Sequence, residues 1–260
     1  MKITLIQCIP SECGTDASLQ SFDELIGTGT GADMYIFPEM FASGQIIDPT
    51  GPAQEMNGST VAWMRRKAAS LDAAVAGSLA VMENGRYYNR MCMAKPDGSV
   101  VLYDKRHLFS YSGENLHYTP GNERVVTEFR GVRILLQVCY DLRFPIFCRN
   151  MDDYDMIVYV ANWPVKRQTS WDVLLRARAM ENQCFVAGVN RTGDDMFGHY
   201  DGHTVLISPY GEVLASASDN TVEMVTCDID MEHLHHFREK FPVMNDADSF
   251  TLTDINYKNT

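Results

Sequence analysis

Short apolar segments with the character of β-strands alternate with helical segments along much of the chain. The strand-like segments include residues 3–7, 34–37, 132–139 and 155–161, and the helical segments include residues 16–26, 59–69, 144–150 and 170–183. This alternation is typical of an α/β fold. The turn dipeptides Asn84-Gly85 and Asp97-Gly98 add hairpins to the alternation, so we expect mixed rather than purely parallel sheets.

The length and composition are those of one globular domain. A chain of 260 residues that is 45% hydrophobic can bury a full core. We see no linker, repeat or low-complexity segment, and we therefore predict a single domain over residues 1–260. The seven cysteines are scattered, and the N-terminal MKITLIQCIP lacks the features of a signal peptide. We therefore predict reduced thiols in a cytoplasmic protein.

Charge and residue spacing argue against several classes of partner. The net charge of −12 makes nucleic acid a poor partner, because no Lys/Arg-rich run offsets it. No apolar run reaches the length that spans a membrane, so we predict no membrane association. His199 and His203 lie four residues apart in GHYDGH, but no cysteine or acidic partner stands at ligand spacing. We therefore predict no metal site.

Three chemically different side chains follow apolar strands. Glu39 follows residues 34–37 and a proline, Lys105 follows a predicted strand in YDKRHLF, and Cys139 ends residues 132–139. Taken alone, each has an ordinary explanation as a solvated acid, a surface ion pair or a buried cysteine. Ligands gather at the carboxyl ends of strands in open α/β sheets. We therefore expect these three side chains to meet around one cavity.

A thiol, a carboxylate and an ammonium are the parts that covalent acyl transfer requires. A free thiol titrates near 8.5, so a neighbouring carboxylate that takes its proton activates it at neutral pH. A lysine ammonium stabilises the oxyanion of the tetrahedral intermediate, and the backbone N–H of Tyr140, the residue after the cysteine, is placed to assist it. The three residues together predict a hydrolase or transferase that acts through a cysteine.

The segments that carry these residues resemble the Glu-Lys-Cys signatures of the nitrilase superfamily, the carbon-nitrogen hydrolases. They are FPEMFASG, YDKRHLF, VCYDLRFP and YVANWP, in the same order along the chain, and the resemblance runs from ITLIQ to SPYGEVLA. DKRHLF, HYTPGN and RNMDDYD are most similar to bacterial omega-amidases of that superfamily. Ala42 in FASG departs from the expected pattern, in which we expect a residue such as threonine.

The resemblance implies a fold, a reaction and catalytic roles. The fold is a single-domain α-β-β-α sandwich of mixed sheets that pairs with a second subunit as a homodimer or larger oligomer. Glu39 is the expected general base, Lys105 the oxyanion cation and Cys139 the nucleophile, and Glu114 matches a second glutamate of the family. The implied enzyme is an omega-amidase that releases ammonia from 2-oxoglutaramate or 2-oxosuccinamate through a cysteine thioester, without a cofactor.

Four further residues are predicted to contact a small-molecule amide substrate: Phe41, Tyr140, Arg143 and Trp163. Arg143 is suited to clamp an acidic substrate, but a structural ion pair with Asp141 or another acid is slightly favoured over that role. Trp163 either walls the pocket or packs in the core. Two other functions stay open: hydrolysis of another substrate, such as an N-carbamoyl amino acid or an aliphatic amide, and a catalytically silent binding subunit.

Overall fold

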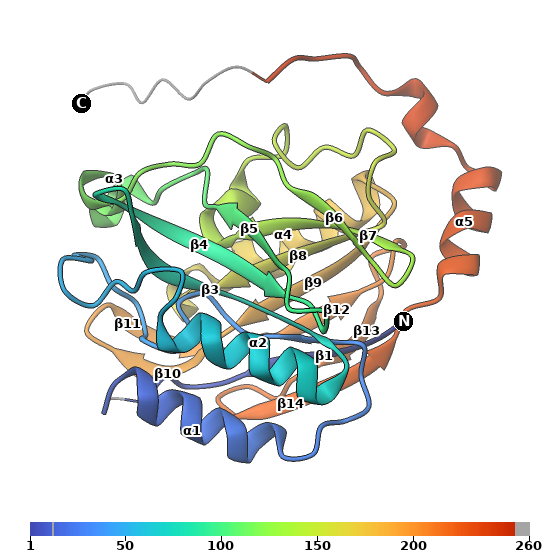
Figure 1. Cartoon of the computed structure of the whole chain (residues 1–260). Helices are drawn as coiled ribbons and strands as arrows, with labels where there is room; N and C mark the ends of the chain where they lie inside the picture. The colour runs from blue at the N-terminus through green and yellow to red at the C-terminus, as the bar shows by residue number, and fades with distance from the viewer. Residues whose placement is uncertain (12, 253–260) are drawn as a thin grey trace.

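A computed structural model describes residues 1–11 and 13–252 of the protein (Figure 1). Within these residues the strands form two six-stranded sheets and one separate hairpin. The first sheet has the order β14 (Glu223–Asp228), β1 (Lys2–Gln7), β2 (Met34–Ile36), β3 (Ala74–Glu83), β4 (Arg86–Ala94) and β5 (Val100–Asp104). Strands β1, β2 and β3 are parallel, and the remaining pairings in this sheet are antiparallel.

The second sheet repeats this mixed pattern. Its order is β13 (Val213–Ser216), β12 (Val205–Ile207), β9 (Phe185–Asn190), β8 (Met156–Ala161), β7 (Val132–Val138) and β6 (Val126–Phe129). Strands β7, β8 and β9 are parallel, whereas β6, β12 and β13 pair antiparallel. The separate hairpin consists of β10 (Thr192–Asp195) and β11 (Gly198–Asp201).

Helices cover the outer faces of the sheets. The α-helices are α1 (Thr15–Ile26), α2 (Ser59–Leu71), α3 (Glu114–His117), α4 (Gln168–Glu181) and α5 (Met231–Lys240). Short 3-10 turns are η1 (Ser110–Ser112), η2 (Cys139–Arg143), η3 (Val165–Arg167) and η4 (Val243–Asp246). Figure 1 shows α1 and α2 side by side along the first sheet and α5 at the edge of the molecule. In the part of the chain that the structure describes, no helix has the length and apolar character needed to cross a bilayer.

Three apolar layers separate the elements. The central layer joins the facing sides of the two sheets, with residues such as Leu5 and Ile36 from the first and Leu136 and Val158 from the second. A second layer lies between the first sheet and α1 and α2, and a third lies between the second sheet and α4. The predicted α/β fold with mixed sheets in an α-β-β-α sandwich is confirmed.

The predicted hairpins β3–β4 and β4–β5 are present. Asn84 and Gly85 both have positive φ, 52° and 73°, as a two-residue turn between twisted strands requires. The second hairpin returns β5 to the direction of β2 and β3. The carboxyl ends of β2 and β5 therefore lie at the same edge of the sheet.

The predicted helix over residues 144–150 is wrong. The chain forms its helical turn earlier, as η2, because the Asp141 carboxylate accepts a hydrogen bond from the Val138 backbone N–H at 3.0 Å and draws the chain round at the end of β7. Residues 144–150 then form an irregular turn. This difference matters, because it puts Cys139 at the start of a tight turn rather than before a longer loop.

Candidate active site

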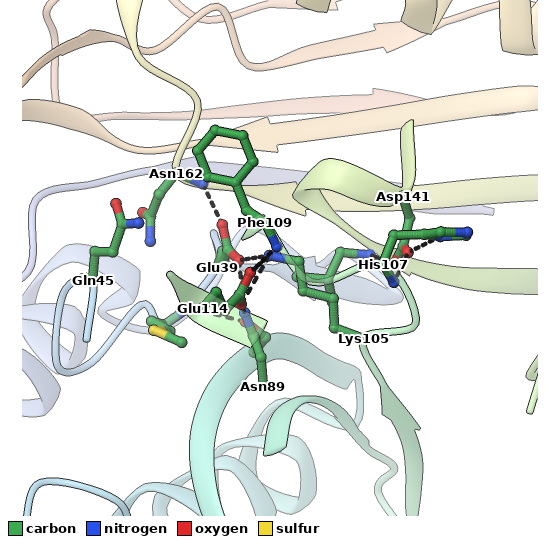
Figure 2. Close-up of polar contacts among 12 residues, drawn as sticks. Glu39, Gln45, Asn89, Lys105, His107, Phe109, Glu114, Asp141 and Asn162 are labelled. Atoms are coloured by element: carbon green, nitrogen blue, oxygen red, sulfur yellow. Dashed lines mark hydrogen bonds and ion pairs between the residues drawn. The ribbon is translucent and has the colours of Figure 1, made fainter. Parts of the chain in front are cut away.

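Glu39, Lys105 and Glu114 form a buried charged cluster (Figure 2). Lys105 Nζ donates to Glu39 Oε1 at 3.0 Å and to Glu114 Oε2 at 2.9 Å. Glu39 lies beyond β2, Lys105 directly follows β5, and Glu114 begins α3. Their exposed fractions are 5%, 2% and 4%. The structure thus brings together one ammonium and two carboxylates from three separate segments.

The two carboxylates keep the Lys105 side chain charged. Burial alone lowers a lysine pKa, because it penalises the ammonium. The carboxylates of Glu114 and Glu39 outweigh this effect and hold the pKa of Lys105 well above its ordinary value. The site therefore presents a fixed cation in a largely dry environment, where an electrostatic interaction is stronger than in water.

Asn89 on β4 orients both carboxylates. Its Nδ2 donates to Glu39 Oε1 at 2.7 Å and to Glu114 Oε1 at 3.1 Å, and its Oδ1 accepts from Ser78 Oγ at 3.0 Å. Glu39 Oε2 also accepts from the backbone N–H of Asn162 at 2.8 Å. Figure 2 shows these groups converging on Glu39 from both sides. Each carboxylate is thereby held in one orientation.

Cys139 is presented at the end of β7 in a strained conformation. Its φ of 46° is in the left-handed region, which non-glycine residues adopt rarely and mostly where the surrounding structure enforces it. Its thiol lines the same cavity as Glu39, and the two groups interact electrostatically. Burial raises the pKa of this thiol well above its ordinary value, Glu39 raises it further, and Lys105 opposes the rise. The resting thiol is therefore protonated and lies beside a carboxylate that can take its proton.

A network around Asp141 fixes the turn that carries Cys139. The fully buried Asp141 carboxylate accepts from Tyr103 Oη at 2.7 Å, from the His107 backbone N–H at 3.0 Å and from the Val138 backbone N–H at 3.0 Å. His107 Nδ1 lies 2.8 Å from the same carboxylate. These contacts tie η2 to the segment that carries Lys105. His107 thus has a hydrogen-bonding role beside Lys105.

These groups line one cavity of about 260 Å³. Glu39, Lys105, Glu114 and Cys139 are all among its lining residues, so the predicted convergence is present in the structure. The volume is smaller than the roughly 300–1,000 Å³ of sites for drug-sized ligands, so it suits a small substrate. Among the described residues, no group of three or more His, Cys, Asp or Glu side chains is arranged to hold a metal ion.

The structure brings three of the four predicted substrate contacts to this cavity. Tyr140, Arg143 and Trp163 line it. Asp141 is occupied by other donors and forms no ion pair with Arg143 in the described residues. Trp163 lines the cavity and also packs against Trp171, so it is both a wall of the pocket and part of the core.

The prediction that Phe41 contacts substrate is wrong. Its ring is fully buried between the first sheet and the helices, 4.7 Å from the ring of Phe37 and 6.1 Å from that of Trp63. The reason is the backbone of Met40, whose φ of 45° turns the chain sharply after Glu39. Phe41 consequently points back into the apolar layer, away from the cavity.

Two asparagines of the site escaped the sequence analysis. Asn89 lies within the hairpin strand β4, where a polar residue between Tyr88 and Arg90 gives no hint of its buried partners. Asn162 follows β8, and its contribution to Glu39 is a backbone N–H, which any residue supplies. The position of Asn162 at a strand end could have marked it as a site residue, whereas no feature of the sequence marks Asn89.

Comparison with known proteins identifies the family. The sequence model of the carbon-nitrogen hydrolases matches residues 2–239, which is nearly the whole chain. Together with the sandwich fold and the cavity, this shows that the chain belongs to the carbon-nitrogen hydrolase family of the nitrilase superfamily and is an amidohydrolase.

Individual relatives are similar over most of their length. The chain is 44% identical to the omega-amidase YafV of Escherichia coli (strain K12) over 253 residues, which cover 97% of this chain and 98% of that one. It is 35% identical to the 2-oxoglutaramate amidase of Bacillus subtilis (strain 168), covering 83% and 85%. The crystal structure of XC1258 from Xanthomonas campestris, with an arsenic adduct in its active site, superposes with a TM-score of 0.94 at 41% identity, covering 97% and 99%.

Proposed function

We propose that this enzyme hydrolyses the ω-amide of small 2-oxo acid amides, 2-oxoglutaramate and 2-oxosuccinamate, to the 2-oxo dicarboxylate and ammonia. The observation that carries the proposal is the meeting of the Cys139 thiol, the Glu39 carboxylate and the Lys105 ammonium in one cavity, where Lys105 Nζ donates to Glu39 Oε1 at 3.0 Å. The similarity to an omega-amidase and to a 2-oxoglutaramate amidase supports this choice of substrate within the family.

The proposed reaction proceeds through a thioester. Glu39 takes the proton of the Cys139 thiol, and the sulfur attacks the amide carbon. The Lys105 ammonium and the backbone N–H of Tyr140 stabilise the oxyanion. When the tetrahedral intermediate collapses, the C–N bond breaks and the nitrogen leaves as ammonia with the proton from Glu39. The carboxylate then deprotonates a water molecule, which hydrolyses the thioester and restores the thiol. The reaction needs no cofactor.

The remaining predicted residues have supporting roles in this proposal. Glu114 accepts hydrogen bonds from Lys105 Nζ through both oxygens and from the Phe109 backbone N–H at 2.6 Å. We therefore assign it to positioning the ammonium. The bound substrate contacts three other residues that line the cavity: Tyr140, Arg143 and Trp163.

The proposal also covers the organisation of the enzyme. Residues 1–260 form a single catalytic domain, of which residues 12 and 253–260 lie outside the described part. The enzyme acts in the cytoplasm as a homodimer or larger homo-oligomer on a small-molecule substrate, without nucleic acid or membrane as a partner. The net charge of −12 supports the exclusion of nucleic acid.

Ammonia release from a panel of substrates tests the proposal. We expect 2-oxoglutaramate to exceed glutamine and an N-carbamoyl amino acid in kcat/KM, and 2-oxosuccinamate to be hydrolysed as well. Cys139→Ala and Lys105→Ala should abolish turnover. Cys227→Ala, which removes a thiol on β14 outside the cavity, should leave it unchanged. Full activity in the Cys139 or Lys105 variant would refute the mechanism, and a preference for the carbamoyl compound would refute the substrate.

A further inference from the structure

Two arginines extend the cavity beyond the reacting groups. Arg143 ends η2, the turn that begins with Cys139, and Arg167 ends η3. The two turns follow the neighbouring parallel strands β7 and β8, so both side chains enter the cavity from the same edge of the second sheet. Both are partly exposed, whereas Glu39 and Lys105 are buried. The arginines therefore lie toward the opening of the cavity.

Neither guanidinium has a carboxylate partner in the described part of the chain. This is unusual in a protein with 34 acidic and 22 basic residues. Several other partly or fully buried arginines do have carboxylate partners: Arg90, Arg124, Arg133, Arg178 and Arg191. Carboxylates pair with these arginines, but none pairs with the two guanidiniums of the cavity within the described residues.

Aromatic rings hold the Arg143 and Arg167 side chains in place without engaging their N–H donors. The Arg143 guanidinium lies 5.0 Å from the ring centre of Trp163, and that of Arg167 lies 5.0 Å from the ring centre of Phe109. Stacking occupies the face of a guanidinium, while its N–H groups lie in the plane and stay free for an acceptor. Trp163 Nε1 also donates to the backbone oxygen of Arg167 at 2.8 Å, which fixes η3.

Charge divides the cavity into two zones. At the buried end, the Lys105 ammonium is matched by the carboxylates of Glu39 and Glu114, and this zone suits an uncharged amide. Toward the opening, two cations face the cavity without a counter-ion. A ligand that fits both zones carries an amide at one end and a carboxylate at the other.

We infer that Arg143 and Arg167 form a guanidinium clamp for the carboxylate of the substrate, and that Arg167 is a specificity-determining residue. The inference rests on the proposed function for the amide end and adds the recognition of the opposite end. Planar N–H forks match the geometry of a carboxylate.

The clamp also explains why a 2-oxo acid suits the site better than a 2-amino acid. The carbonyl oxygen beside the carboxylate accepts a hydrogen bond from the same donors. An ammonium in that place has no acceptor there and is repelled by two guanidiniums, and such like-charge contacts are a common source of discrimination. We therefore expect glutamine to be a poor substrate although its amide end is identical.

The test compares substrates that differ only at the clamped end. Wild-type protein, Arg167→Met and Arg167→Lys are assayed with 2-oxoglutaramate and with the uncharged pentanamide. The control is Arg66→Met, which removes an exposed guanidinium on α2, outside the cavity. We expect Arg167→Met to lower the ratio of kcat/KM for 2-oxoglutaramate to that for pentanamide by about 10- to 100-fold, mainly through KM. The ratio for Arg167→Lys should lie between those of the wild type and Arg167→Met, because lysine keeps the charge but lacks the planar pair of N–H donors. Arg66→Met should not change the ratio.

The outcomes separate the clamp from the proposed substrate. An unchanged ratio in Arg167→Met, or an equal loss on both substrates, overturns the clamp. A wild-type enzyme that prefers pentanamide to every amide bearing a carboxylate overturns it as well. A wild-type enzyme that ignores 2-oxoglutaramate but cleaves another such amide refutes the proposed substrate, and a selective loss on that acid in Arg167→Met then supports the clamp.

Discussion

The Lys105 ammonium is the charge on which the proposed mechanism depends. It is shared by two buried carboxylates, one of which, Glu39, is also the proposed base. Glu114 is the larger of the two contributions that raise the lysine pKa. A division of labour follows from the contacts. In the proposed mechanism, Glu114 keeps Lys105 charged and oriented, and Glu39 exchanges a proton with Cys139.

Replacing Glu114 with glutamine tests this division at the level of one residue. Loss of the negative charge lowers the pKa of Lys105, because burial, which favours the neutral amine, is then opposed mainly by Glu39. Since the proposed mechanism needs the ammonium, the alkaline limb of the kcat–pH profile should shift to lower pH. We expect kcat at neutral pH to fall by about 10- to 100-fold, because a Lys105 ammonium that is held less firmly stabilises the oxyanion less.

The control for this variant is Glu83→Gln. Glu83 pairs with Arg90 on the β3–β4 hairpin and does not line the cavity, so its profile should match that of the wild type. An alkaline limb that stays in place in Glu114→Gln would show that Glu114 does not control the charge of Lys105.

At the scale of the element, the turn η2 is held by one carboxylate rather than by its own sequence propensity. Asp141 accepts from Val138 on β7, from Tyr103 on β5 and from His107 just after β5. The strained φ of Cys139 is maintained by these contacts. The turn therefore joins Cys139 to the segment that carries Lys105.

Asp141→Asn should weaken both the fold and the reaction. The carboxamide has one acceptor oxygen where the carboxylate has two, so buried donors lose a partner, at a cost of about 1–3 kcal/mol in the free energy of unfolding. Urea unfolding measures this loss, and kcat should fall with it because Cys139 is less well oriented. Asp248→Asn, an exposed substitution, is the matched control. Unchanged stability together with unchanged kcat would exclude a supporting role for Asp141.

The same scale explains what the sequence could predict. Glu39, Lys105 and Cys139 were found because each lies at or shortly after the end of an apolar strand, and the ends of strands that run in one direction share an edge. Phe41 was misplaced because a side-chain direction depends on the left-handed backbone of Met40, which no pattern signals. Asn89 was missed because its importance arises from partners distant in sequence.

At the scale of the whole molecule, the site spans both halves of the sandwich. Glu39 and Lys105 follow strands of the first sheet, whereas Cys139 and Asn162 follow strands of the second. Hydrogen bonds cross between the halves, as from the Asn162 backbone to Glu39 and from Tyr103 to Asp141. We therefore expect the packing between the sheets to set the separation of Cys139 and Glu39, the proposed nucleophile and base, and the helical layers to act less directly.

Two leucine truncations distinguish these layers. Leu136 lies on β7 in the layer between the sheets, and Leu175 lies on α4 in the outer layer, and both are fully buried. Leu136→Ala and Leu175→Ala should each lower the free energy of unfolding by about 2–5 kcal/mol, measured by urea unfolding.

The effects of the two truncations on kcat, measured well below both melting temperatures, should differ. A gap between the sheets lets Cys139 shift relative to Glu39, and displacements of about 1 Å at reacting groups can cost about 100-fold in rate. We therefore expect Leu136→Ala to lose at least about tenfold more kcat than Leu175→Ala, and equal losses would show that the sheets do not set this separation.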